Sequence, residues 1–170
     1  LGGRPGPDLA DPDADLAGAV SALVGYANPQ ARVRDALVDC HVMRGIGNVF
    51  RSEVLWGAEL SPWARVGDIT ETDAAELVAV AERLCRASRS AVRPAPSAAG
   101  LEVYGRVGQG CSRCHDTIEA LPVGARGRML YWCPGCQVRL DPRPPAPRPM
   151  DPHPAATKFL NELQNARRAR

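Results

Sequence analysis

The segment CSRCHDTIEALPVGARGRMLYWCPGC, residues 111–136, holds four of the six cysteines of the chain. Cys111 and Cys114 form one Cys-x-x-Cys pair, and eighteen residues separate it from a second pair, Cys133 and Cys136. Two such pairs are typical of a zinc ribbon, in which two tight turns on a β-hairpin bring four thiolates to the corners of a tetrahedron. So small a unit cannot bury a core of its own, and the sequence therefore predicts that one structural Zn²⁺ stabilises it.

Two disulfides in a secreted domain are the alternative for these four cysteines. The chain opens with LGGRPGPDLADPDADL, which is acidic and rich in proline and glycine rather than a secretion signal, and two further cysteines are left over. Both observations favour zinc. His115 follows Cys114 directly, is poorly placed to replace a thiolate, and is expected at the surface.

The first hundred residues have helical periodicity. A first helix is predicted to end at Gly25, and its apolar residues recur at helical spacing: Leu16, Val20, Leu23 and Val24. A second is predicted from Asn28, the N-cap, with Pro29 at the first helical position, to about Val42. Its inner face is expected to hold Val33, Ala36, Leu37 and Cys40.

Two more helices are predicted downstream. A short one covers about residues 49–56 and is stopped by Gly57 and Pro62. A longer one opens at TETD, residues 70–73, which is close to a capping box with Asp where Glu is usual. Its inward residues are Leu77, Val78, Ala81, Leu84 and Cys85, so that Cys85, like Cys40, is expected to be a buried core thiol.

Composition suggests where the chain divides. The segment RPAPSAAG, residues 93–100, is typical of a linker, and residues 141–154 carry seven prolines in fourteen positions. We therefore expect a helical domain over residues 1–92, a linker over residues 93–100, a four-cysteine finger over residues 101–140 and a flexible, basic tail over residues 141–170. The predicted fold is mainly α, a helical bundle followed by a β-hairpin zinc ribbon and a disordered, Pro-rich tail.

Charge is distributed unevenly. The 170-residue chain has a net charge of +2, yet residues 1–100 hold 10 Lys/Arg against 13 Asp/Glu, and residues 101–170 hold 11 against 6. The second part is therefore the better candidate for contacting phosphates, although a solvated basic surface would give the same count. Only Lys158 among the 21 basic residues is a lysine. No run of 18 apolar residues exists, so no membrane span is expected.

Two local patterns are candidate phosphate contacts. In GIGN, residues 45–48, Gly45 and Gly47 permit a reversal between helices, and Asn48 is predicted to cap the next helix, whose N-terminal N–H groups would then face an anion. A simple connector between helices is the alternative. Arg126 and Arg128 lie at the predicted hairpin tip, where guanidinium groups suit phosphate, although both are also compatible with ordinary exposed arginines.

These patterns occur together in an order that resembles one protein family. LVDCHVMRGIGNVFRSEVLWGAELSPW resembles the helix–two-turns–helix of the formamidopyrimidine-DNA glycosylase and endonuclease VIII family, and VYGRVGQGCSRC…GRMLYWCPGCQ resembles its C-terminal zinc finger. The opening GPDLADPDAD is similar to the start of the family's second domain, so the resemblance covers about residues 6–138. The style of the finger, with VYGR and WCPGCQ, favours the endonuclease VIII-like branch.

The resemblance implies roles for individual residues. Asn48 matches the asparagine that binds backbone phosphate beside the lesion, and the four cysteines match the zinc ligands. Arg128 matches the hairpin arginine that grips the phosphate of the flipped nucleotide and takes part in δ-elimination, and Arg126 is the fallback because a shift of two residues in a strand keeps the same face. An arginine, with a pKa above about 12, is a poor acid, which favours charge stabilisation of the leaving phosphate.

The departures from the family concern catalysis. Family members begin with Pro-Glu after Met removal and form a Schiff base with abasic sites for β,δ-elimination. This sequence has no counterpart of that N-terminal domain, and Pro5 is no substitute because its nitrogen is in an amide bond. His41 stands where relatives often have Arg or Lys. The chain is therefore expected to be the DNA-binding part of a bifunctional DNA glycosylase and AP lyase, inactive alone.

The resemblance also implies partners, an oligomeric state and a cellular location, and two alternative functions remain. The expected partners are double-stranded DNA with damaged bases or abasic sites and the missing catalytic domain, in a monomeric, cytoplasmic, nucleoid-associated bacterial protein. One alternative is a stand-alone, non-catalytic DNA-binding protein derived from the family. The other is an RNA-binding module, because a small-subunit ribosomal protein has a similar helix–two-turns–helix, although without a four-cysteine ribbon.

Overall fold

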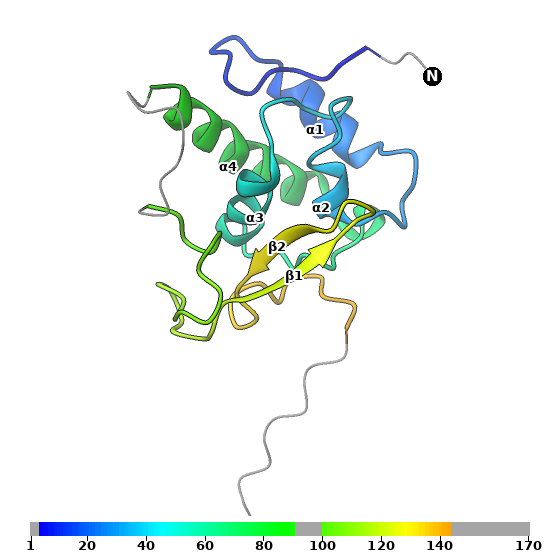
Figure 1. Ribbon diagram of the computed structural model, residues 1–170. Helices are drawn as coiled ribbons and strands as arrows, with labels where there is room; N and C mark the ends of the chain where they lie inside the picture. The colour runs from blue at the N-terminus through cyan, green and yellow to red at the C-terminus, as the bar shows by residue number, and fades with distance from the viewer. Residues whose placement is uncertain (1–3, 91–99, 144–170) are drawn as a thin grey trace, which may run out of the picture.

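The structure is a computed structural model that describes residues 4–90 and 100–143. Four helices, a short 3₁₀ turn and a two-stranded sheet make up its regular elements (Figure 1). In chain order they are α1 (Leu16–Val24), α2 (Val33–Ala36), α3 (Asn48–Gly57), the 3₁₀ turn η1 (Val66–Asp68), α4 (Glu71–Ser90), β1 (Glu119–Val123) and β2 (Arg128–Trp132). The predicted fold class, a mainly helical unit followed by a β-hairpin with a four-cysteine cluster, is confirmed.

The ends of α1 and α4 follow from local sequence. Asp15 precedes α1 and its side chain accepts a hydrogen bond from the Gly18 N–H at 2.8 Å. The capping box before α4 is also confirmed, because the Asp73 carboxylate accepts from the Thr70 N–H at 2.8 Å and the Thr70 hydroxyl accepts from the Asp73 N–H at 3.1 Å. Gly25 ends α1 as predicted.

The predicted second helix is wrong at both ends. Asn28 caps a turn and not a helix, since its side-chain oxygen accepts from the Gln30 N–H at 3.0 Å. The Pro29 carbonyl accepts from the Gly67 N–H at 2.8 Å, and such long-range bonds hold the chain out of the helix until α2 begins. Because α2 then ends at Ala36, Cys40 lies in the following loop and is exposed, contrary to the expected core position.

One core joins the helices to the hairpin. Its fully buried members include Leu23 of α1, Leu55 of α3 and Leu77 of α4, and Val123 and Leu130 of the hairpin belong to the same cluster. Cys85 is buried there, as predicted. A smaller cluster beneath the cysteine turns consists of Val103, Cys111, Ile118 and Cys133. The expectation that the finger cannot bury a core is therefore wrong, because it buries this small cluster and also shares the core of the helices.

Three side chains, two of them buried and one exposed, fasten the finger to the helices. The Glu53 carboxylate of α3 accepts hydrogen bonds from three consecutive backbone N–H groups, those of residues 102–104, at 2.8–3.0 Å. Gln137 is buried, accepts from the Cys133 N–H at 2.8 Å and donates to the Leu60 carbonyl at 3.1 Å. Arg139 donates to the Ala58 carbonyl at 2.9 Å and pairs with carboxylates of α4.

Parts of the predicted domain division lie outside the described residues. The linker predicted at residues 93–100 is described only at Gly100, and the Pro-rich tail is described only as far as residue 143. The division into two domains remains a prediction. Within the described ranges, none of the helices combines the length and the apolar character needed to cross a bilayer.

Candidate metal centre and nucleic-acid interface

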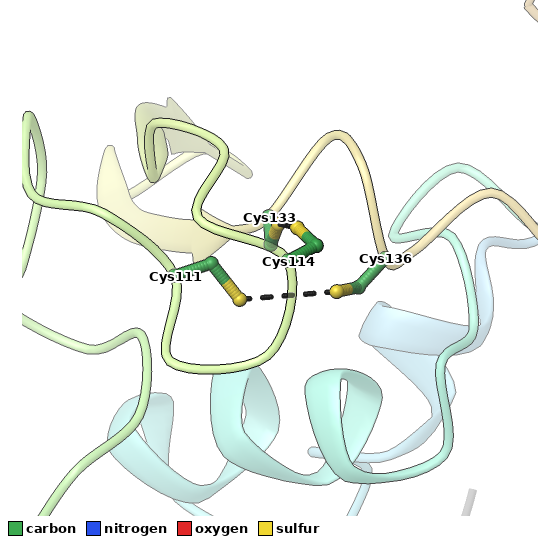
Figure 2. Close-up of side chains that lie close together, drawn as sticks. All are labelled: Cys111, Cys114, Cys133 and Cys136. Atoms are coloured by element: carbon green, nitrogen blue, oxygen red, sulfur yellow. Dashed lines mark hydrogen bonds between the residues drawn. The ribbon is translucent and has the colours of Figure 1, made fainter.

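The four cysteines of the ribbon converge on one point. Cys111 and Cys114 come from the loop before β1, and Cys133 and Cys136 from the loop directly after β2 (Figure 2). All four sulfurs lie within 4.8 Å of one another, with 3.8 Å between those of Cys111 and Cys136 and 3.3 Å between those of Cys114 and Cys133. All six described cysteines are free thiols, so the arrangement is not a pair of disulfides.

This donor set fits a tetrahedral zinc ion. A Zn–S bond of about 2.3 Å places the sulfurs of a tetrahedron about 3.8 Å apart. Gly135 eases this approach, because a Cβ there would lie 3.1 Å from the Cys114 sulfur and would displace the Asp116 carboxylate, 2.2 Å away. His115 is exposed, as predicted, and is not one of the four converging groups.

Neighbouring donors prepare Cys111 for a cation. Burial raises the pKa of its thiol, but backbone N–H groups and the Trp56 indole outweigh burial and lower the pKa to about 6. The Trp56 indole N–H lies 3.5 Å from the sulfur, and the Arg113 N–H lies 3.4 Å from it. Burial, and then hydrogen bonds with the adjoining thiols, instead raise the pKa of Cys133 to about 11. A bound cation would favour the thiolate and so act against both effects.

The turn at residues 45–48 contains one position that requires glycine. Gly45 has a φ of +100°, and a Cβ there would meet the buried Cys85 sulfur at 3.0 Å. Gly47 has extended backbone and occupies the N-cap of α3, so the prediction that Asn48 is the cap is wrong. Asn48 is instead the first helical residue, and its side chain donates to the Met129 carbonyl of β2 at 2.7 Å.

The start of α3 nevertheless presents backbone donors. Within the described part of the chain, the N–H groups of residues 48–50 have no hydrogen-bond acceptor, because the first intrahelical bond runs from the Arg51 N–H to the Gly47 carbonyl. The N-terminus of a ten-residue helix therefore offers free N–H groups and the positive end of its dipole.

Arg51 is a residue that the sequence analysis did not single out. It is only 4% exposed, and its guanidinium donates to the Asn48 side-chain oxygen. Burial lowers its pKa, and its Nε has no hydrogen-bond partner. The sequence signal was its position three residues after Asn48 on the same helical face, but an arginine is usually exposed.

The hairpin brings its two arginines to the same end of the sheet. Pairing in register places Arg128, the first residue of β2, opposite the buried Val123, so that Arg128 lies on the face toward α3. Arg126 lies in the turn between Gly124 and Gly127, which both have positive φ. The two arginines are therefore not related by strand alternation, and the predicted equivalence of their faces does not apply. Both are exposed, and neither guanidinium has a hydrogen-bond or ion-pair partner among the described residues.

A hollow of about 440 Å³ separates the hairpin tip from the helical turn. Arg126 and Arg128 line one side of it, and Gly47 and Arg51 line the other. Gly45 and Asn48 line a separate, smaller hollow of about 240 Å³. Of the predicted DNA contacts, the structure thus brings Gly47, Arg126 and Arg128 together, and it places Gly45 and Asn48 beside them.

Curated proteins with similar sequences indicate the family of this chain. The chain is 38% identical over 149 residues to a probable endonuclease 8 2 from Streptomyces coelicolor and 35% identical over 137 residues to endonuclease 8 2 from Mycobacterium tuberculosis. It is 31% identical over 146 residues to the formamidopyrimidine-DNA glycosylase of Corynebacterium aurimucosum. The chain belongs to the formamidopyrimidine-DNA glycosylase and endonuclease VIII family. No family model matches the chain.

The chain corresponds to the C-terminal half of the proteins of this family. These three alignments cover 78–84% of this chain but only 50–52% of the relatives. The chain therefore spans about half the length of the curated relatives it matches. The higher identities to the two endonuclease 8 proteins agree with the endonuclease VIII-like branch.

Solved structures of the family share the fold. A Lactococcus lactis Fpg in complex with DNA containing an abasic site matches with a TM-score of 0.66 and 25% identity, over 79% of this chain and 52% of that one. The MutM (Fpg) protein from Thermus thermophilus matches with a TM-score of 0.65 and 26% identity, over 79% and 54%.

Proposed function

We propose that this chain is the DNA-binding half of a bifunctional base-excision-repair enzyme, a DNA glycosylase and AP lyase that acts on oxidised bases and abasic sites. The observation that carries the proposal is the hollow of about 440 Å³ in which Gly47 at the start of α3 faces Arg126 and Arg128 of the hairpin. Backbone N–H groups on one side and guanidinium groups on the other suit the phosphates of a bent DNA backbone.

The four cysteines are proposed to hold one structural Zn²⁺. A zinc ion bound by Cys111, Cys114, Cys133 and Cys136 would fix the two loops that flank the hairpin, and structural zinc contributes on the order of 10–16 kcal/mol in finger peptides. The hairpin turn, and with it Arg128, would then have a fixed position relative to α3. The metal has no part in the chemistry at DNA.

The role proposed for this chain follows from how a glycosylase flips its target nucleotide out of the DNA stack. A glycosylase extrudes the target nucleotide at a cost of a few kcal/mol and holds the bent backbone on both sides of it. This chain would supply that grip, with Arg128 stabilising the negative charge of the leaving phosphate during δ-elimination. The amine that forms the Schiff base, and the pocket for the base, would belong to the part of the relatives that this chain does not match.

Binding of the zinc-loaded, 170-residue chain to a fluorescent duplex with a tetrahydrofuran abasic-site analogue tests the proposal. The affinity should fall with salt with a slope that corresponds to about 2–4 phosphates. Arg128→Ala should weaken binding and reduce that slope by about 1. Arg83→Ala, which removes an exposed arginine of α4 outside the hollow, is the matched control and should leave both unchanged. An affinity independent of salt would contradict the proposal.

A further inference from the structure

The loop after α2 brings three different ligand atoms together. A carboxylate oxygen of Asp39, the sulfur of Cys40 and a ring nitrogen of His41 lie within 4.8 Å of one another. The His41 Nδ1 is 3.0 Å from the Asp39 Oδ1 and 3.9 Å from the Cys40 sulfur. This cluster is separate from the four-cysteine centre, and neither the ribbon nor the proposed DNA contacts use it.

The backbone holds these consecutive residues in a converging arrangement. The Asp39 carbonyl accepts from the Val42 N–H at 3.0 Å and from the Met43 N–H at 3.2 Å, which closes a tight turn around Cys40 and His41. The Cys40 carbonyl accepts from the Gly6 N–H at 2.9 Å. The turn is thus fastened to the N-terminal segment, and little reordering is needed for the three side chains to meet one ion.

Tyr26 orients the carboxylate from the other side. Its hydroxyl donates to the Asp39 Oδ2 at 3.0 Å, which leaves Oδ1 directed at His41. A hydrogen bond from outside that fixes a ligating carboxylate is the usual second contact of a protein metal site. The backbone N–H of His41 also donates to Oδ1, at 2.9 Å, which further fixes the carboxylate.

The cluster is open to solvent on one side. Asp39 and His41 line a hollow of about 480 Å³ together with Tyr26 and Asn28. The side chains of His41 and Asp39 are 53% and 29% exposed, and Cys40 is exposed as well. An ion held by three protein ligands would therefore have space for a further ligand from water.

We propose that Asp39, Cys40 and His41 form a second metal site, for a divalent transition ion such as Zn²⁺ or Co²⁺. In a tetrahedral zinc site, mixed sulfur, nitrogen and oxygen ligands lie about 3.4–3.6 Å apart, and the separations of 3.0 and 3.9 Å lie on either side of that range. A thiolate, an imidazole and a carboxylate together select ions of intermediate softness over Mg²⁺ and Ca²⁺. Binding forms a metal–sulfur bond and transfers the Cys40 thiol proton to the buffer. The ring nitrogen of His41 must be unprotonated to bind the ion, so a proton on Nδ1 moves to Nε2 or to the buffer.

The stoichiometry of metal binding by the full chain tests the proposal. Equilibrium dialysis against buffered Zn²⁺, followed by elemental analysis, should give a second equivalent of zinc beyond that of the ribbon. Cys40→Ser and His41→Ala should each lower the occupancy of the second equivalent at least tenfold at the same free Zn²⁺. The matched controls, Cys85→Ala and His115→Gln, change the same residue types elsewhere and should retain it.

The number of zinc equivalents bound by the unaltered chain and by the variants decides whether the second metal site exists. A single equivalent in the unaltered chain, or a second equivalent that persists in the double variant Cys40→Ser/His41→Ala, would overturn the proposal. Co²⁺ titration of the zinc-loaded chain provides an independent readout, because a new sulfur-to-cobalt charge-transfer band should appear and should be absent from Cys40→Ser. Both side chains are exposed, so these variants should keep the fold, which circular dichroism would verify.

Discussion

The side-chain amide of Asn48 donates to the backbone carbonyl of Met129 at 2.7 Å, across 81 residues of sequence. This bond joins the first residue of α3 to β2, at the place where the proposed DNA contacts meet. The same asparagine accepts from the buried Arg51. Asn48 thus positions the hairpin as well as lying beside the candidate phosphate site.

Asn48→Ala should lower the free energy of unfolding by about 1–3 kcal/mol, because the Arg51 guanidinium then loses an acceptor in a buried place. Urea unfolding of the zinc-loaded chain measures this difference. Asn28→Ala removes an exposed turn asparagine and should cost clearly less. Equal costs for the two variants would show that the hydrogen bonds of the Asn48 side chain to Arg51 and Met129 contribute little.

Glu53→Gln should also destabilise the chain, by about 1–3 kcal/mol. The carboxylate accepts three backbone hydrogen bonds from residues 102–104, and an amide replaces one acceptor oxygen with a donor. Thermal unfolding of zinc-loaded protein is the measurement, and Glu119→Gln, at an exposed position of β1, is the control. A melting temperature equal to that of the control would count against this anchor.

Asp73 should contribute stability that depends on pH. Its pKa is lowered, first by the Thr70 backbone N–H, then by the Thr70 hydroxyl and by Arg139. Because the folded-state pKa lies below the unfolded value of about 3.9, this contribution is present above that pH and is lost as pH falls through the folded-state value. The difference in melting temperature between the unaltered chain and Asp73→Asn should therefore shrink on acidification. A difference that is constant with pH would contradict the assignment, and Asp68→Asn, at an exposed carboxylate, is the control.

Metal removal should release the finger. A strong chelator, or Cys111→Ser, should change the near-ultraviolet circular dichroism of Trp56, whose indole N–H lies 3.5 Å from the Cys111 sulfur and whose ring stacks 3.9 Å from the Arg113 guanidinium. Added zinc should restore the signal of the unaltered chain but not that of Cys111→Ser. A spectrum insensitive to chelation would rule out a structural role for metal.

Borohydride trapping on an abasic-site duplex examines where the nucleophile lies. The 170-residue chain has one lysine, Lys158, and its N-terminal amine. We expect non-covalent binding without a trapped adduct. An adduct would show that one of these amines attacks the sugar, and Lys158→Arg would then identify which.

Elements governed by neighbouring residues were predictable, and those governed by distant ones were not. The capping box at Thr70 and each Cys-x-x-Cys pair depend on a spacing of three residues, and two such pairs eighteen residues apart are a recognisable pattern of a ribbon. The start of α2 was mispredicted because Pro29 is bonded to Gly67, a contact that no local pattern encodes.

In the candidate site, too, some residues were predictable from local sequence and others were not. The two arginines at the hairpin tip were found from the turn between the cysteine pairs. The role of Gly47 as the cap, and the burial of Arg51, were missed, because both depend on Asn48 using its side chain to hold β2. An asparagine before a helical pattern indicates a cap only when nothing distant competes for its amide.

Because Val123 and Leu130 of the hairpin belong to the helical core, the stability of the helices should depend on the metal bound by the finger. We expect the zinc affinity of the ribbon and the folding free energy of α1, α3 and α4 to be linked, because these side chains are buried among the helices. Zinc starvation should therefore accelerate amide hydrogen exchange in α4, which carries none of the four cysteines of the ribbon. In a metal-poor cell, the protein would become a substrate for proteases as a whole and would not persist as a helical remnant without its finger.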